Sequence, residues 1–507
     1  MTEAAVPDKP AADADTAKRQ KERVEQYLAQ APTCASGSVA TDAGRIDYRS
    51  VAEFVPVRAG GIDARRGEPE AAVFTTAYLV GDDAARPLCF AFNGGPGSAS
   101  IWLHLGALGP KRIVVPDDAS APRPPFAVSD NPLTWLRHFD LVFVDPPHTG
   151  WSISAGDDAR KKHLSVDGDV AALADVIEGW LARHRRWGAP VYVAGESYGT
   201  TRAAALADAL QSAGVALAGL VLVSCAMDLQ SLEFAPRNDL PYALFLPAFA
   251  NTAQYHGRLA GALGASGAAA RAAAEAFVAD DYLAALHAGS RLGERERARV
   301  ARRVAELTGL PRDLVERRNL RIADATFFVE LLRAQGRIVG RLESRSTGPM
   351  AASQRFEWEF DPGIEAIVAP YTAAAMRYFG DQLGLHDTLQ WRQRYEVLSF
   401  DAHRQWDWNR KGADGQPRRG NAFASTSDDL SRALRRNPHL RVLVASGRYD
   451  LGTPYSASDW SLAQLDVPPD VRRRIVHRYY DAGHMMYTRE ADLRQLASDL
   501  GGWLAAG

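Results

Sequence analysis

The chain has 507 residues, of which 46% are hydrophobic and 24% charged, and its formal net charge is −2 at pH 7. This length and composition suit a folded protein with a large buried core, and the near-neutral charge argues against nucleic acid as a partner. The apolar runs are too short and too interrupted to span a bilayer, so we expect no membrane partner.

The chain contains three cysteines, Cys34, Cys89 and Cys225, and the last two lie in apolar runs typical of core strands. No spacing typical of metal ligands is present, so we expect neither a metal nor another cofactor. Residues 1–31 contain no apolar segment of the kind that a secretory signal needs, and we therefore predict a cytoplasmic location.

Strands are expected over residues 48–57, 72–79 and 87–92, and the third runs into the sequence NGGPGS at residues 93–98. A helix is expected over residues 99–108. Tandem glycines let the backbone approach a ligand closely and direct N–H groups at a developing negative charge. A phosphate-binding loop would need a lysine and a serine or threonine after the glycines, which this loop lacks. We interpret the loop as part of an oxyanion hole, with a tight turn as the alternative.

The pentapeptide GESYG at residues 195–199 follows the apolar run 191–194 and precedes a helix-like stretch over residues 200–211. A strand, a sharp turn and a helix are the context of a nucleophile elbow, in which small neighbours permit a strained backbone at the serine. The alternative is a purely structural turn. Ser197 is therefore the candidate nucleophile.

A serine nucleophile needs a base, usually a histidine, and a carboxylate that fixes the tautomer of that histidine. Asp450 follows the strand-like run 441–445, and His484 follows the alternating run 474–480. This is the Ser, Asp, His chain order of α/β-hydrolases. We predict a catalytic triad of Ser197, Asp450 and His484, with Asp481 as the alternative acid.

These motifs together resemble the serine carboxypeptidase family, in particular its bacterial branch. The resemblance rests on the NGGPG loop, the GESYG elbow and the segments around Asp450 and His484, and it extends from about residue 37 onward. It implies an α/β-hydrolase fold, with a central, mostly parallel sheet flanked by helices, and serine-type carboxypeptidase activity.

The resemblance also assigns roles to residues around the predicted triad. It implies that Asn93, Gly94 and Glu196 bind the free C-terminal carboxylate of a peptide substrate. It further implies that the backbone N–H groups of Gly95 and Tyr198 form the oxyanion hole. Two ionised carboxylates at hydrogen-bonding distance repel each other, so recognition by Glu196 requires one shared proton and favours acidic pH.

The chain departs from the family pattern at four positions. Many secreted relatives carry a second glutamate in the place of Ala107, a cysteine in the place of Ser98 and a proline in the place of Tyr487, and the family has a glycine in the place of His148. The first departure predicts a weaker preference for acidic pH. The second indicates that the relatives' disulfide framework is absent.

Ser197 and Asp450 lie further apart in the sequence than the few strands and helices of a minimal hydrolase require. We therefore predict a helix-rich insertion over residues 234–419, which by analogy with the family forms a cap over the catalytic cleft. The predicted organisation is a poorly ordered segment over 1–36, the first part of the α/β core over 37–233, this cap, and the C-terminal part of the core over 420–507. Helices within the cap are expected over residues 260–286, 294–307 and 324–333.

The resemblance thus implies an enzyme that hydrolyses the C-terminal peptide bond of peptides through an acyl-enzyme, with a peptide bearing a free C-terminus as its partner. Two alternatives remain. One is a serine carboxypeptidase-like acyltransferase or esterase on the same scaffold, which a product assay distinguishes. The other is a non-catalytic binding protein, which covalent labelling of Ser197 distinguishes.

Overall fold

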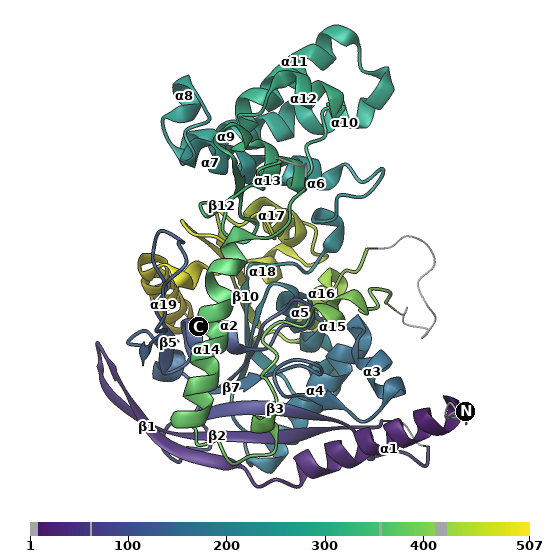
Figure 1. Cartoon of the computed structure of the whole chain (residues 1–507), viewed down its shortest axis with the longest axis vertical. Coiled ribbons are helices and arrows are strands. Elements are labelled where there is room, and N and C mark those ends of the chain that lie inside the picture. Colours follow the sequence, from purple (N-terminus) through teal and green to yellow (C-terminus); the bar gives the residue numbers. More distant parts are fainter. Residues whose placement is uncertain (1–8, 61–62, 354–356, 411–422, 507) are drawn as a thin grey trace, which may run out of the picture. The chain divides into compact units, whose positions relative to one another are not determined.

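The computed structural model describes residues 9–60, 63–353, 357–410 and 423–506 (Figure 1). The chain forms two compact units, each assembled from segments that are distant in the sequence. The first unit comprises Met1–Arg112, Val128–Leu220 and Thr372–Ala424. The second comprises Ile113–Ala127, Val221–Tyr371 and Ser425–Gly507.

The sheet of the first unit is antiparallel at one side and parallel where it carries the predicted site. Its strands lie in the order β1 (Thr33–Thr41), β2 (Gly44–Arg58), β3 (Pro69–Leu79), β7 (Asp140–Val144), β4 (Leu88–Phe92) and β9 (Val191–Glu196), and β8 (Ile153–Ser154) pairs with β3. The pairs β7·β4 and β4·β9 are parallel, and the earlier pairs are antiparallel. Every residue of β4 and β7 is buried, as expected for parallel strands covered on both faces.

Helices pack on this sheet through apolar faces. The longer ones are α1 (Lys9–Leu28), α3 (Asp157–His163), α4 (Val166–Arg183) and α5 (Tyr198–Ser212). Helix α4 begins at Ser165, whose hydroxyl accepts a hydrogen bond from Gly168 N, and it packs against β2 and α5. Helix α5 packs against β9. The shorter elements are α2 (Ile101–Leu103), α15 (Phe400–Arg404), β5 (Lys111–Ile113) and β6 (Val128–Asp130).

The start of the chain differs from the predicted poorly ordered segment over residues 1–36. Helix α1 and strand β1 occupy most of it, and residues 1–8 lie outside the described part of the chain. Val24 and Tyr27 of α1 are buried, and the Tyr27 ring stacks on Phe54 of β2 with 4.7 Å between centroids. A few apolar side chains thus hold a helix whose polar composition favours disorder.

The second unit holds the chain's C-terminal strands and the helical region. After the earlier segment Ile113–Ala127, the chain returns to this unit within β10 (Leu217–Val223). Strands β13 (Arg441–Gly447) and β14 (Ile475–Tyr480) pair in parallel, with Gly447 opposite Tyr480 at their ends. The helices that accompany them are α16 (Ser427–Arg436), α17 (Tyr455–Ala463), α18 (Pro469–Arg472) and α19 (Glu490–Ala505).

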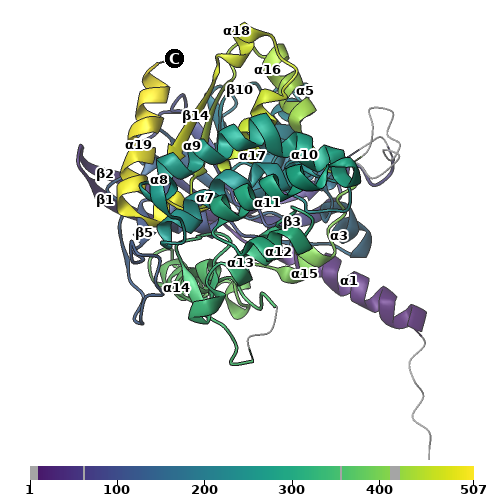
Figure 2. The same ribbon diagram turned by 90° about the horizontal axis from the view of Figure 1, so that it is seen from above.

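The predicted insertion is rich in helices up to residue 330. These are α6 (Leu240–Leu244), α7 (Leu246–Tyr255), α8 (Gly261–Gly264), α9 (Gly267–Phe277), α10 (Leu283–Ala288), α11 (Glu294–Thr308), α12 (Arg312–Arg317) and α13 (Asp324–Glu330). Figure 2 shows α7, α9 and α11 side by side. Phe249 of α7 stacks on Phe327 of α13 in the apolar core of this region, with 4.1 Å between the ring centroids. The single helix predicted over 260–286 is interrupted, because Ser266 caps a new helix at Gly267.

The end of the predicted insertion does not group with its beginning. Helix α14 (Pro362–Asp381) crosses from the second unit into the first, so residues 234–371 belong to the second unit and residues 372–410 to the first. Residues 411–419, at the predicted boundary, lie outside the described part of the chain. A role of the helical region as a cap over a catalytic cleft stays a prediction.

The strand order and the strand–elbow–helix arrangement confirm the predicted α/β-hydrolase fold, with its parallel strands and flanking helices. In the ranges that the structure describes, no helix is both long and apolar enough to cross a membrane.

Candidate active site

Ser197 sits at a sharp turn between a strand and a helix. Strand β9 ends at Glu196 and helix α5 begins at Tyr198, and Ser197 between them has φ 59° and ψ −129°. A positive φ at a residue with a side chain costs about 1–3 kcal/mol and persists only where the surroundings enforce it. The backbone therefore has the strained geometry that the GESYG pattern predicts.

The glycine-rich loop lies directly against this elbow. A Cβ added at Gly94 would overlap Tyr198 N and lie 2.7 Å from Gly199 N. Only a residue without a side chain allows that approach. Gly95 follows with φ 99°, a conformation that also favours glycine. The first unit thus brings together the two segments that carry the predicted oxyanion donors, Gly95 and Tyr198.

Asn93 and Glu196, the predicted carboxylate-binding side chains, are both buried. Asn93 Oδ1 accepts a hydrogen bond from Leu103 N at 3.0 Å, and its carbonyl oxygen accepts one from Arg202 Nη1 at 2.6 Å. Because Asn93 Oδ1 already accepts the hydrogen bond from Leu103 N, the Nδ2 group is the part of this side chain that could donate to a substrate carboxylate. Glu196 is the last residue of β9, next to Ser197.

Asp450 is fully buried and holds the imidazole of His484. Asp450 Oδ1 accepts hydrogen bonds from the backbone N–H groups of Gly452 and Thr453 at 2.8 and 2.9 Å. Its Oδ2 accepts from Thr453 Oγ1 at 2.7 Å and from His484 Nδ1 at 2.8 Å. A carboxylate only accepts, so the proton of the neutral imidazole lies on Nδ1. The other nitrogen, Nε2, is then the one that can accept a proton.

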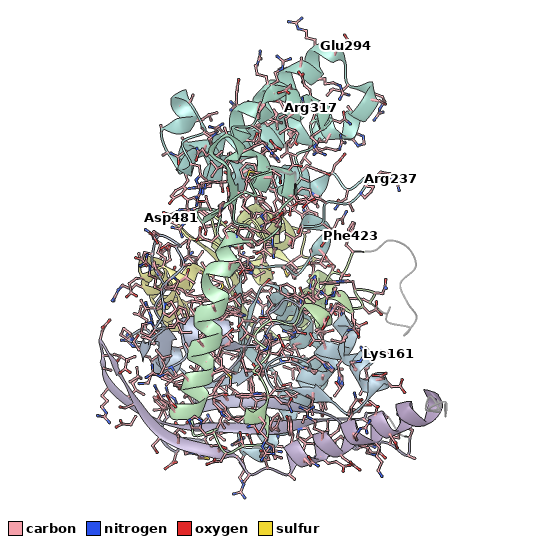
Figure 3. The ribbon with its side chains drawn as sticks, viewed as in Figure 1. Lys161, Arg237, Glu294, Arg317, Phe423 and Asp481 are labelled. Atoms are coloured by element: carbon pink, nitrogen blue, oxygen red, sulfur yellow. The ribbon has the colours of Figure 1, made fainter. Side chains whose placement is uncertain are left out.

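Asp481, the alternative acid, points elsewhere. Its side chain is 60% exposed, and its Oδ1 accepts a hydrogen bond from Arg448 Nη1 at 2.9 Å. Asp481 is labelled in Figure 3. Its sequence distance to His484 is short, but the carboxylate that contacts the imidazole comes from the loop after β13.

The segment DPPHTGWS at residues 145–152 supports the glycine-rich loop. Asp145 Oδ1 accepts hydrogen bonds from Ser100 N and Ser100 Oγ at 2.9 and 2.7 Å, and burial raises the pKa of Asp145 to about 6. His148, which replaces the family glycine, has φ 68° and donates to or accepts from Ser154 Oγ at 2.8 Å. Burial lowers the pKa of His148 to about 4. This turn therefore tolerates a neutral histidine at a backbone position that suits glycine.

Sequence reasoning missed a second support for the glycine-rich loop. Ser399 N donates to Gly97 O at 2.7 Å, and Ala99 N donates to Val397 O at 3.1 Å. The segment around residues 397–399 was assigned to the insertion, yet in the first unit it bonds the predicted oxyanion loop. No local pattern around these residues signals that pairing.

The predicted site residues fall into two groups. Asn93, Gly94, Gly95, Glu196, Ser197 and Tyr198 belong to the first unit, and Asp450 and His484 belong to the second. Among the described residues, no group of three or more His, Cys, Asp or Glu side chains could hold a metal ion.

Comparison with known proteins finds a family match in the part of the chain that carries the first group. The family model described as serine carboxypeptidase matches residues 71–224, which include both the NGGPG loop and the GESYG elbow. Serine carboxypeptidase-like 36 of Arabidopsis thaliana is 32% identical over 117 residues. That match covers 22% of this chain and 22% of the relative, so the chain spans under a quarter of the relative's length.

Solved structures add weaker similarities. Proline iminopeptidase of Mycobacterium smegmatis is 12% identical with a TM-score of 0.35, and the comparison covers 93% of this chain and 100% of that one. The Cif epoxide hydrolase of Acinetobacter nosocomialis is 12% identical with a TM-score of 0.32, and the comparison covers 99% of both chains. Neither TM-score reaches 0.5, so the fold assignment rests on the strand order and the elbow. The family comparison rests on the sequence match alone: residues 71–224 of this chain match the serine carboxypeptidase family model.

Proposed function

We propose that this protein is a serine carboxypeptidase, which hydrolyses the C-terminal peptide bond of peptides through an acyl-enzyme. The observation that carries the proposal is the family match over residues 71–224, because this region contains both the predicted nucleophile and the predicted carboxylate-binding loop. The hydrogen bond between His484 and Asp450 supports it, since this bond leaves Nε2 of the imidazole available as a base.

In the proposed mechanism, Ser197 Oγ attacks the carbonyl carbon of the last peptide bond while His484 Nε2 takes its proton. The N–H groups of Gly95 and Tyr198 stabilise the resulting oxyanion. His484 then returns the proton to the leaving amine, and an acyl-enzyme remains on Ser197. Water, activated by His484, attacks this ester and releases the shortened peptide. Asp450 orients His484 and stabilises its cationic form throughout.

The proposed specificity for a free C-terminus comes from Asn93, Gly94 and Glu196. Asn93 Nδ2 and the backbone of Gly94 offer donors to the substrate carboxylate. Glu196 contributes only while it shares a proton with that carboxylate, because two negative charges at this distance repel. Ala107 stands where many relatives carry a second glutamate, so recognition depends on fewer groups.

We expect a free acid to be cleaved faster than a matched amide. The test compares N-blocked dipeptides ending in a free carboxylate with the same dipeptides ending in a dimethylamide, followed from pH 4 to pH 8. A buried polar group left unpaired by the amide costs about 1–3 kcal/mol, so kcat/KM for the acid should be at least about tenfold higher at low pH. The advantage should shrink as the pH rises and Glu196 ionises.

Two variants at Glu196 sharpen this test. Glu196→Gln keeps a hydrogen-bond donor but cannot ionise. This variant should therefore preserve the preference for the free-acid substrate, and that preference should no longer decline as the pH rises. Glu196→Ala should reduce the preference at all pH values. An unchanged preference in Glu196→Ala would remove this residue from the recognition set.

The same assays decide between the proposal and its alternatives. Equal rates for the acid and the amide would contradict the carboxypeptidase and leave a general serine hydrolase. Transfer of the acyl group to an added alcohol or amine in preference to water would identify an acyltransferase. A fluorophosphonate probe that fails to label Ser197 would indicate a non-catalytic binding protein.

A further inference from the structure

A short loop of the helical region contacts both C-terminal site loops in the second unit. It comprises residues 341–345 and connects β11 (Arg337–Val339) to β12 (Thr347–Pro349), which pair in antiparallel fashion. We call residues 341–345 the brace. Its sequence, RLESR, shows no motif, and it lies within the predicted insertion.

The brace holds the loop that carries Asp450 from both sides. Ser344 N donates a hydrogen bond to Tyr449 O at 3.0 Å, and Leu451 N donates one to Arg341 O at 2.9 Å. Tyr449 and Leu451 are the neighbours of Asp450 in the sequence. Their backbone lies beyond the end of β13, where Tyr449 N also donates a hydrogen bond to Ala482 O at 3.0 Å. The brace therefore restrains the backbone that positions the acid.

The brace also holds the loop that carries His484. His484 N donates to Leu342 O at 2.7 Å, and Gly483 N donates to Glu343 Oε2 at 2.9 Å. A Cβ at Gly483 would overlap Leu342 O and lie 2.8 Å from Glu343 Cα, so this packing requires glycine. Acid and base loops thus share one support.

Glu343 is itself held in place by charge. Its carboxylate accepts hydrogen bonds from Arg345 Nε at 2.8 Å and Arg345 Nη2 at 2.6 Å, and the two side chains are only 12% and 10% exposed. The Arg345 guanidinium lies over the ring of Tyr449, 5.1 Å from its centroid. Asp361 anchors the start of the brace by accepting from Arg341 N and Leu342 N at 3.0 and 3.1 Å.

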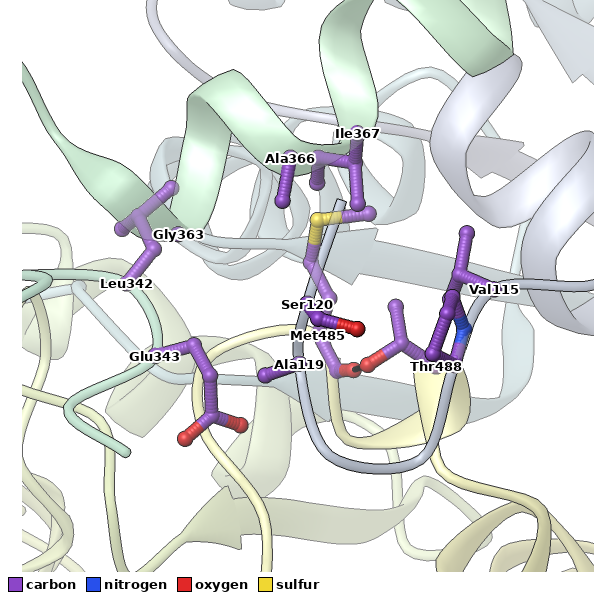
Figure 4. Close-up of a pocket in the computed structure, with 11 residues that line it drawn as sticks. Val115, Ala119, Ser120, Leu342, Glu343, Gly363, Ala366, Ile367, Met485 and Thr488 are labelled. Atoms are coloured by element: carbon purple, nitrogen blue, oxygen red, sulfur yellow. Dashed lines mark hydrogen bonds between the residues drawn. The ribbon is translucent and has the colours of Figure 1, made fainter. Parts of the chain in front are cut away.

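A small hollow open to solvent adjoins the brace, and Figure 4 shows the residues that line it. Leu342 and Glu343 line it together with Met485, the residue after His484.

We propose that Glu343 is a positioning residue, which fixes the imidazole of His484 against Asp450 through its hydrogen bond to Gly483 N. The inference rests on the proposed function, in which His484 is the base of a serine hydrolase. A base must be held within a fraction of an ångström of its working position, and a misplacement of 1 Å costs on the order of 10²-fold in rate. Without the Glu343 carboxylate, Gly483 N loses its acceptor and the loop loses a direct link to the brace.

The test compares Glu343→Ala and Glu343→Gln with the wild type. The alanine variant should label Ser197 with a fluorophosphonate about 10²-fold more slowly, with kcat reduced similarly and KM unchanged, since an effect through the base acts on chemistry and not on binding. The glutamine variant keeps an acceptor for Gly483 N but loses the charge that pairs with Arg345, so it should recover part of the rate, to within about tenfold of wild type.

A matched control comes from the same unit. Glu330, the last residue of helix α13, is 16% exposed and pairs with Arg333, whose Nε lies 2.9 Å from Glu330 Oε1. Among the described residues, the structure gives Glu330 no hydrogen bond to the loops of Asp450 and His484. Glu330→Gln removes the same kind of charge at a comparable burial. Its labelling rate should equal that of the wild type.

A spectroscopic readout makes the outcome independent of activity. The proton on His484 Nδ1, shared with Asp450, should give a low-field proton resonance in the wild type and in Glu330→Gln, and it should shift or broaden in both Glu343 variants. Folded Glu343 variants with wild-type rates and an unchanged resonance would overturn the inference. Should Glu343→Ala fail to fold, Glu343→Gln decides by the same two measurements. A wild-type protein that Ser197 probes do not label would contradict the proposed function, while the resonance would still decide the role of Glu343.

Discussion

Ser197→Ala is expected to abolish both covalent labelling by a fluorophosphonate and turnover, because the variant lacks the oxygen that forms the acyl-enzyme. His484→Ala and Asp450→Asn should each slow acylation by about 10³-fold or more. In Asp450→Asn the amide can present an N–H group to His484 Nδ1. This favours the wrong imidazole tautomer and withdraws the base. The measurements are the labelling rate and kcat, with circular dichroism as a check of folding.

Asp481→Asn is the matched control for the acid. It makes the same chemical change three residues before His484, at a side chain that is 60% exposed and bonded to Arg448. We expect near-wild-type rates. Retained activity in Asp450→Asn together with loss in Asp481→Asn would reverse the assignment of the acid.

Arg202→Met is expected to cause the largest loss of stability in the first unit. Arg202 Nε donates to Asp169 Oδ2 at 2.7 Å, and both side chains are only 1% exposed. Burial raises the pKa of Asp169 although Arg202 opposes the rise. Removing the arginine leaves a buried carboxylate without its counter-charge, which costs about 3–5 kcal/mol in the free energy of unfolding. The loss should be measured by urea denaturation.

This buried pair also matters for the site. Arg202 Nη1 donates to the carbonyl oxygen of Asn93, and the guanidinium lies over the ring of Tyr198 at 5.2 Å from its centroid. We therefore expect Arg202→Met to weaken discrimination between free acid and amide as well as stability.

Two further variants test whether the missing counter-charge of Asp169 causes the loss of stability in Arg202→Met. Arg45→Met breaks the exposed pair of Arg45 with Asp47 in the same unit, where the two side chains are 71% and 74% exposed, and should change the stability by less than about 1 kcal/mol. The double variant Asp169→Leu with Arg202→Met removes both charges and should recover most of the lost stability. A loss below about 1 kcal/mol in Arg202→Met alone would show that the pair is not important for stability.

The fold class and the local form of the site could be predicted from the sequence because their signals are contiguous. The strand, the GESYG turn and the following helix lie within about twenty residues, and the strained φ of Ser197 follows from the chain on either side. The same holds for the NGGPG loop after β4. Asp450 could be predicted as the acid, with Asp481 as an alternative, because it follows a strand-like run in the expected chain order.

Other features depended on tertiary contacts that the amino-acid composition does not reveal. Helix α1 looks polar in the sequence, and only the burial of Val24 and Tyr27 against β2 explains why it is helical. The predicted insertion likewise appeared continuous, whereas α14 divides it between the two units.

The sequence by itself determined the candidate nucleophile, the glycine-rich loop and the positions of the predicted acid and base, because each rests on a local rule of strand, turn and residue type. Only the tertiary structure decided which hydrogen bonds fix these residues in position. The choice of Asp450 over Asp481 needed the hydrogen bond to His484, and the role of Glu343 needed its bond to Gly483, a residue 140 positions away in the sequence. Backbone N–H and carbonyl groups at loop ends are alike in every residue, so no side-chain pattern specifies which distant loop will satisfy them.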